Sequence, residues 1–151
     1  MPSDIRRHRT FAEKVEEHFG FLRAEFGFLG PEEDAGAFLF DRPDFRVELL
    51  RDPRTDDVFL LLWRIGAKHE LPAEEGPVKR PWVREDLADA AARFLPGTPI
   101  RYSVTGRTRH CLDRSLTGQA EVLVQVLQVL GVRAPQTDGD SRAKTERGRP
   151  G

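Results

Sequence analysis

One short stretch of this sequence holds three residue types that catalyse reactions when they meet in space. Cys111 follows His110 directly and precedes Asp113 by two positions, which supplies the nucleophile, base and orienting carboxylate of a cysteine hydrolase. Neighbours in sequence seldom face one another productively, because catalytic triads assemble from distant segments. The stretch therefore predicts a structural thiol at Cys111, and the sequence predicts no catalytic residue.

Metal ligands and paired carboxylates are the next chemistry that the residue types suggest. The histidines lie on separate segments, with no pair four residues apart and no cysteine at zinc spacing. They are His8, His18, His69 and His110. Acidic residues gather at 16–17, 32–34, 56–57 and 74–75, and such runs are typical of solvated surface. We therefore expect no metal and no cofactor.

The basic turn from Thr105 to His110 is the strongest binding motif in the chain. It holds Arg107 and Arg109, and Arg114 follows near the expected start of a helix. Arginine offers two parallel N–H groups to a phosphate or carboxylate, and a helix N-terminus adds partial positive charge. In an arginine-rich chain we expect these side chains to face solvent or to pair with Asp113 and Asp89, and an anion-binding site is the alternative. A second basic run at 6–9 predicts only a weak electrostatic contact.

The composition limits the kind of protein that holds these residues. A chain of 151 residues predicts a single domain with its own core. Its 24 basic and 25 acidic side chains nearly cancel, whereas nucleic-acid binders usually carry an excess of Lys and Arg. No apolar run is long enough for a membrane span, and the charged first ten residues do not resemble a signal peptide. The lone cysteine fits a reducing compartment, so we expect a cytoplasmic protein.

The N-terminal half has the pattern of one helix followed by a small sheet. Thr10 and Glu13 have the spacing of a capping box, which predicts that the helix starts at Thr10. Apolar residues then recur every three or four positions as far as Phe26, and Gly27 ends the helix. Alternating apolar residues predict strands at 37–40, 45–49 and 58–65, after an acidic loop at 32–34. The third strand is apolar on both faces, which makes it the best candidate for the central or most covered strand.

The C-terminal half is predicted to return to helices. Residues 66–81 are rich in glycine, proline and charge, so we expect irregular structure there. Helices are predicted at 82–95 and from 112 or 116 to 130, with Gly131 as the cap of the second. Residues 100–104 alternate, which predicts either a fourth strand or an extended loop. The chain from 135 onward has no apolar anchor, so a disordered tail at 135–151 should follow a single domain at 1–134.

Together these elements predict an α+β fold. Short turns join the strands, so the sheet should be an antiparallel meander of three or four strands. The N-terminal helix and two C-terminal helices should pack on one face of it, leaving the other face wet. In this arrangement Val47 points into the core and Arg46 points to solvent.

The order of apolar and acidic residues in the first half resembles a class of small, uncharacterised bacterial α+β proteins. The resemblance spans Phe11 to Ile65 and rests on Phe19, Phe21-Leu22, Phe26-Gly27-Phe28, Phe45-x-Val47 and Asp52-x-Arg54-x-Asp56-x-Val58. Some members of the class resemble immunity proteins that neutralise a partner toxin. The resemblance implies the fold and, through its immunity type, a protein partner. It implies no catalytic or cofactor-binding residue.

The sequence thus predicts a non-catalytic module that binds another protein through its wet sheet face and charged loops. The candidate contact residues are Arg46, Glu48, Arg64, Asp56 and Asp57. The first alternative is a small-ligand or anion-binding module that uses Arg107, Arg109 and Arg114. The second is an enzyme whose site the sequence does not reveal. The oligomeric state is not predicted.

Overall fold

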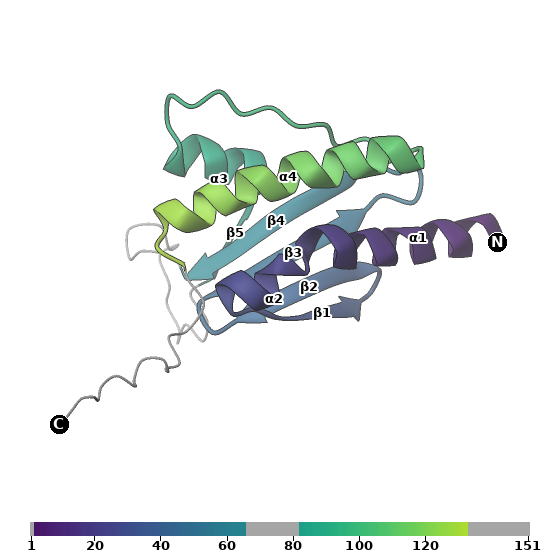
Figure 1. Ribbon diagram of the computed structural model, residues 1–151, viewed down its shortest axis with the longest axis horizontal. Coiled ribbons are helices and arrows are strands. Elements are labelled where there is room, and N and C mark those ends of the chain that lie inside the picture. The colour runs from purple at the N-terminus through teal and green to yellow at the C-terminus, as the bar shows by residue number, and fades with distance from the viewer. Residues whose placement is uncertain (1, 66–81, 133–151) are drawn as a thin grey trace, which may run out of the picture.

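The chain forms an antiparallel sheet with helices on one side of it (Figure 1). The computed structural model describes residues 2–65 and 82–132. In chain order the elements are α1 (Pro2–Phe19), α2 (Phe21–Phe26), β1 (Leu29–Asp34), β2 (Ala37–Arg42), β3 (Phe45–Arg51), β4 (Val58–Ile65), β5 (Trp82–Asp86), α3 (Leu87–Phe94) and α4 (Arg109–Val129). The strands pair in the order β1-β2-β3-β4-β5. The α+β class is therefore confirmed, and the meander has five strands where three or four were expected.

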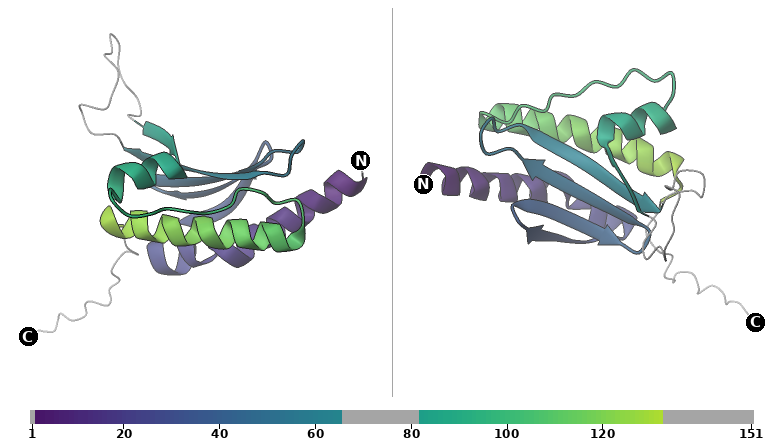
Figure 2. Two further views of the ribbon diagram at one scale, coloured as in Figure 1. Left: turned by 90° about the horizontal axis from the view of Figure 1, so that it is seen from above. Right: turned by 180° about the vertical axis from the view of Figure 1, so that it is seen from behind.

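The core lies between the helices and one face of the sheet (Figure 2). Most apolar strand residues that point to this face are buried, among them Val47 on β3 and Leu60 on β4. They meet the apolar stripe of α1, whose predicted core residues Phe11, Val15 and Phe19 are all buried. Because side chains alternate along a strand, every second residue of β3 and β4 faces away from the helices. That outer face carries no helix in the described part of the chain.

The N-terminal helix differs from the prediction at both ends. α1 begins at Pro2 rather than at Thr10, because the preceding charged residues continue the helix and no breaker separates them from Thr10. The helix is also interrupted at Gly20, where a Cβ atom would lie 2.8 Å from the carbonyl oxygen of Glu16. α2 then ends at Gly27, which has a φ of 75° as a helix-terminating glycine requires.

The acidic residues 32–34, expected in a loop, belong to β1. They pair with β2 across a two-residue turn in which Ala35 and Gly36 both have positive φ, the backbone that a tight hairpin needs. β1 is the exposed edge of the sheet, and its register shifts between Leu29 and Glu32. Pro31 lies within that irregular part.

The region after residue 82 combines a strand and a helix where one helix was expected. Trp82–Asp86 pairs with β4 as β5, and α3 starts at Leu87. The Asp86 side chain accepts a hydrogen bond from the Ala88 N–H at 2.9 Å, which fixes the start of α3. β4, expected to be the central or most covered strand, is an interior strand paired with both β3 and β5, while β3 occupies the middle of the sheet. Its residues alternate between buried and partly exposed along most of its length.

Residues 99–105 form an extended segment rather than a fourth strand. Its contacts with the sheet are a bridge between Asp57 and Thr105 and a 2.7 Å hydrogen bond from the Val58 N–H to the Val104 carbonyl. α4 begins earlier than predicted, at Arg109.

The predicted irregular segment at 66–81 and the tail at 135–151 lie outside the described residues. Among the described helices, none has the length and apolar character needed to span a membrane.

Candidate functional site

The outer face of the sheet holds a row of four side chains that the strand register places side by side. Asp41 on β2 is opposite Arg46 on β3, Arg46 is opposite Trp63 on β4, and Trp63 is opposite Arg84 on β5. Directly opposed residues in an antiparallel sheet have their Cβ atoms about 5 Å apart, so such neighbours contact one another. We call the outward residues of β2 to β5 the tryptophan face. Its members are Ala37, Leu39, Asp41, Arg46, Glu48, Leu50, Phe59, Leu61, Trp63, Ile65, Trp82, Arg84 and Asp86.

Trp63 is fixed by its neighbours at the centre of this face. Its indole Nε1 donates a hydrogen bond to Glu48 Oε1 at 2.8 Å. The guanidinium carbons of Arg46 and Arg84 lie 5.8 and 5.4 Å from its ring, within the range of cation–π attraction. Arg84 also donates to Glu48, and Arg46 donates to Asp41 at 2.5 Å. The two arginines that contact the ring are therefore themselves held by hydrogen bonds to carboxylates.

A hollow of about 480 Å³ opens beside Trp63. Its lining combines two indole rings with charged groups, and consists of Asp41, Arg42, Pro43, Arg46, Trp63 and Trp82. The volume lies within the range of small-molecule sites and also suits a single side chain from another protein. Aromatic residues and arginine are enriched in the contact surfaces of proteins relative to the rest of their surface.

The predicted partner-binding residues do not all share this face. Arg46 and Glu48 lie on it, but Arg64 does not, so its predicted position is wrong. Arg64 follows the alternation of Leu60 and Leu62 and points toward the helices, where its side chain is 7% exposed. There it donates to Glu85 at 3.0 Å and stacks on Phe94. The apolar run of β4 concealed this alternation in the sequence.

Asp56 and Asp57 lie in the turn between β3 and β4, at the opposite end of β4 from Trp82. Asp56 is buried, and its two carboxylate oxygens accept hydrogen bonds from Arg7 at 2.5 Å and Arg51 at 2.9 Å. Its φ of 63° places it in the left-handed region. Asp56 therefore belongs to the interior, and the expected acidic contact surface is reduced to Asp57.

The three arginines of the alternative anion-site hypothesis are divided between two places. Arg107 and Arg109 line a cavity of about 180 Å³, while Arg114 lines a separate shallow hollow with Arg101. The helix explains the separation, because five residues at about 100° each turn Arg114 roughly 140° away from Arg109. The cavity is also lined by Arg51 and by Arg6 and Arg7 of the basic run at 6–9, and no pattern in the sequence places these residues there.

Cys111 does not form the triad that its neighbours suggest. It is partly exposed, and its backbone N–H donates to the Thr108 side chain that caps α4 at 3.0 Å. Asp113 turns instead toward α1, where His18 Nε2 lies 2.8 Å from its Oδ1. The backbone of Cys111 and the carboxylate of Asp113 thus contact different groups.

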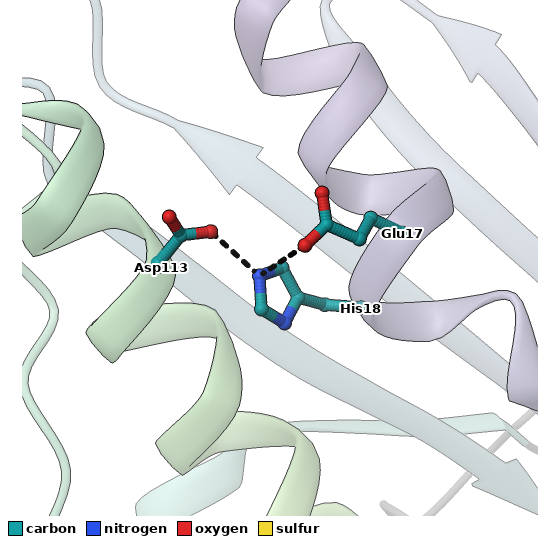
Figure 3. A group of neighbouring side chains, drawn as sticks. All are labelled: Glu17, His18 and Asp113. Carbon is teal, nitrogen blue, oxygen red and sulfur yellow. Dashed lines mark hydrogen bonds and ion pairs between the residues drawn. The ribbon is translucent and has the colours of Figure 1, made fainter.

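Asp113 meets Glu17 and His18 in a cluster that joins α4 to α1 (Figure 3). Their ligand atoms all lie within 4.8 Å of one another, so they are the residues best placed to hold a metal among those described. The ammonium of Lys14, however, lies 3.1 Å from Asp113 and 3.2 Å from Glu17. A lysine already supplies the cation that these carboxylates attract, so the donor set fits a charge cluster better than a metal centre.

The cluster has a clear electrostatic signature. Hydrogen bonds from His18 and then Lys14 hold the pKa of the Asp113 carboxyl below its ordinary value. The same carboxylate raises the pKa of Lys14. Both pKa shifts favour the charged forms of Asp113 and Lys14, which link α4 to α1. Its residues are up to 99 positions apart in the chain, so no sequence pattern signals the contact.

Comparisons of the chain with models of protein families, with curated proteins and with solved structures find no match. The resemblance to bacterial proteins of the immunity type stays a prediction.

Proposed function

We propose that this protein is a non-catalytic binding protein that recognises another protein through the tryptophan face. The observation that carries the proposal is the pair Trp63 and Trp82 beside a hollow on a sheet face without a helix in the described part of the chain. Tryptophan and arginine dominate the energetically important residues of protein interfaces. Here both types occur together on a rigid sheet.

The contacts of Trp63 favour binding because they reduce the side-chain entropy that is lost when a partner binds. The ring is held by Glu48 and by two guanidinium groups before any partner arrives. Ordering a flexible side chain at an interface costs about 0.5–1.5 kcal/mol, and a ring already fixed avoids that loss. A preorganised indole at the centre of the face is therefore suited to act as an anchor.

The charges of the face indicate the chemistry of the partner. The side chains of Arg46 and Arg84 are 39% and 43% exposed, whereas those of the acids Asp41 and Glu48 are 35% and 12% exposed. The two most exposed of these four charged groups are thus cationic. We infer a partner that presents carboxylates around an apolar or aromatic projection, because opposite charges at the rim steer association.

The remaining expectations from the sequence belong to the same proposal. The resemblance to immunity proteins makes a toxin encoded beside this chain the first partner to test. A cytoplasmic location fits the lone Cys111. An enzyme with an unrecognised site is the competing reading.

The test replaces the two exposed arginines of the face by glutamate, in the variant Arg46→Glu/Arg84→Glu. The matched control is Arg101→Glu/Arg114→Glu, which makes the same change of net charge at a separate hollow. A partner captured from the native host is purified, and its Kd is measured for wild type and both variants. We expect the face variant to weaken binding at least tenfold, or about 1.4 kcal/mol, while the control binds like wild type.

Thermal melts of the free proteins show whether either variant is unfolded, and Trp82→Ser tests the apolar anchor without any charge change. Equal affinity for wild type and both face variants would overturn the proposal. Saturable turnover of a small substrate that the face variants leave intact would replace it with the enzyme reading.

A further inference from the structure

A cavity lined by arginines lies where three distant segments meet at one end of the molecule. α1 and α4 both begin at the same end, and the turn before α4 reaches the end of β3 (Figure 1). The cavity of about 180 Å³ between them is lined by five arginines and one carboxylate. We call this cavity the arginine pocket; its charged members are Arg6, Arg7, Arg51, Arg107, Arg109 and Asp56.

The charge of the arginine pocket is far from that of the whole protein. Five guanidinium groups and one carboxylate leave four excess positive charges around it, in a chain whose net charge is −1. Among the described residues no second acid lines the cavity. Like charges this close repel one another, so an anion that enters the cavity gains attraction from several groups at once.

Asp56 pairs with two of the five arginines and leaves the charge of the other three in place. Both of its oxygens are already engaged, one by Arg7 and the other by Arg51. Arg51 is itself 8% exposed on its side chain, so its guanidinium is fixed in the wall. The exposed Arg6, Arg107 and Arg109 form no ion pair with any other described residue.

The turn that carries Arg107 is fixed to the opposite wall by close backbone packing. A Cβ atom at Gly106 would lie 2.7 Å from the Asp56 carbonyl oxygen, so the turn approaches the β3–β4 connection as only glycine allows. The bridge between Asp57 and Thr105 holds the same two segments together. Arg107 and Arg109 are therefore brought to Asp56 by the fold itself and not by chance proximity of long side chains.

We propose that the arginine pocket binds the phosphoryl group of a small phosphorylated ligand. Its volume equals that of about six water molecules, which is enough to admit a phosphate group. Arginine forms paired N–H···O bonds with phosphate oxygens, and the 21-residue helix α4 adds partial positive charge where Arg109 begins it. The site is independent of the tryptophan face.

The test uses inorganic phosphate and methyl phosphate as probes of the full-length chain. Binding is measured by calorimetry and by melting temperature against sodium chloride at equal ionic strength, because specific binding stabilises the folded state by mass action. The pocket variant is Arg107→Gln/Arg109→Gln. The control is Arg101→Gln/Arg114→Gln, which removes two arginines of the same region that line a different hollow.

We expect phosphate to raise the melting temperature of wild type and control alike, and the Kd of the pocket variant to rise at least tenfold. Tighter binding of methyl phosphate than of phosphate identifies an organic phosphate as the ligand class, and the reverse identifies free phosphate. The proposal is overturned if phosphate acts no more strongly than chloride or if pocket and control variants respond equally. It is also overturned if single-stranded DNA binds through these arginines while both phosphate probes fail.

Discussion

Replacing Val47 by aspartate gives the most direct test of the sheet register. Val47 is fully buried on the helix-covered face, opposite Phe40 on β2 and Leu62 on β4. A carboxylate there is stable only when protonated, because burial disfavours its charged form. Holding it neutral at pH 7 costs about 4 kcal/mol, at about 1.4 kcal/mol for each pH unit above the ordinary aspartate value. Losing the buried valine adds about 2 kcal/mol, so the total approaches the entire stability of a small domain.

The pH dependence separates this mechanism from simple loss of packing. The introduced carboxyl has a raised pKa in the folded state, so its penalty is smallest in acid and grows as the pH rises. Val47→Asn is the control, since it has nearly the same size and cannot ionise. Urea unfolding at a series of pH values should show the aspartate variant losing about 1.4 kcal/mol per pH unit relative to the asparagine variant. A constant difference, or two variants as stable as wild type, would refute burial of residue 47.

Two further predictions concern the charged contacts. Asp56→Asn should lower the free energy of unfolding by about 3–5 kcal/mol, because it removes a buried ion-pair partner of Arg51. Asp57→Asn should change it by less than about 0.5 kcal/mol. Equal losses in urea unfolding would contradict the assignment. The Asp113 carboxyl has a lowered pKa in the folded state, so the stability it contributes is present above its ordinary pKa and is lost as pH falls through the lowered value. Melting temperatures should therefore fall less steeply in acid for Asp113→Asn than for wild type, and parallel profiles would count against the cluster.

Local patterns predicted the parts of the fold that depend on one segment alone. β4 begins and ends at the predicted residues, and the apolar stripe of α1 is buried as expected. β1 was missed because its acidic residues suit a loop, and only pairing with β2 makes them a strand. β5 was missed because its residues run without a break into α3, so one helical pattern covered both.

The candidate sites were less predictable because their residues meet only after folding. Arg46 was correctly placed on the outer face, but its neighbour Arg84 comes from a strand that had been assigned to a helix. The arginine pocket joins residues from α1, β3 and the start of α4. Arg107 and Arg109 belong to the alternative hypothesis of an anion site. Arg7 and Arg51, which line the same pocket, can be identified only from the tertiary structure.

The irregular edge strand β1 has a consequence for self-association. A second chain that extends a sheet must find a regular row of N–H and C=O groups, and Pro31 has no N–H to offer. The register shift near Glu32 and the following acidic side chains disturb that row further. Polymerisation by sheet extension needs two receptive edges on each molecule, one to donate and one to accept. If the β1 edge does not accept another strand, two chains that pair through their β5 edges have no further edge for a third chain. This architecture therefore favours a finite dimer over an unlimited fibre.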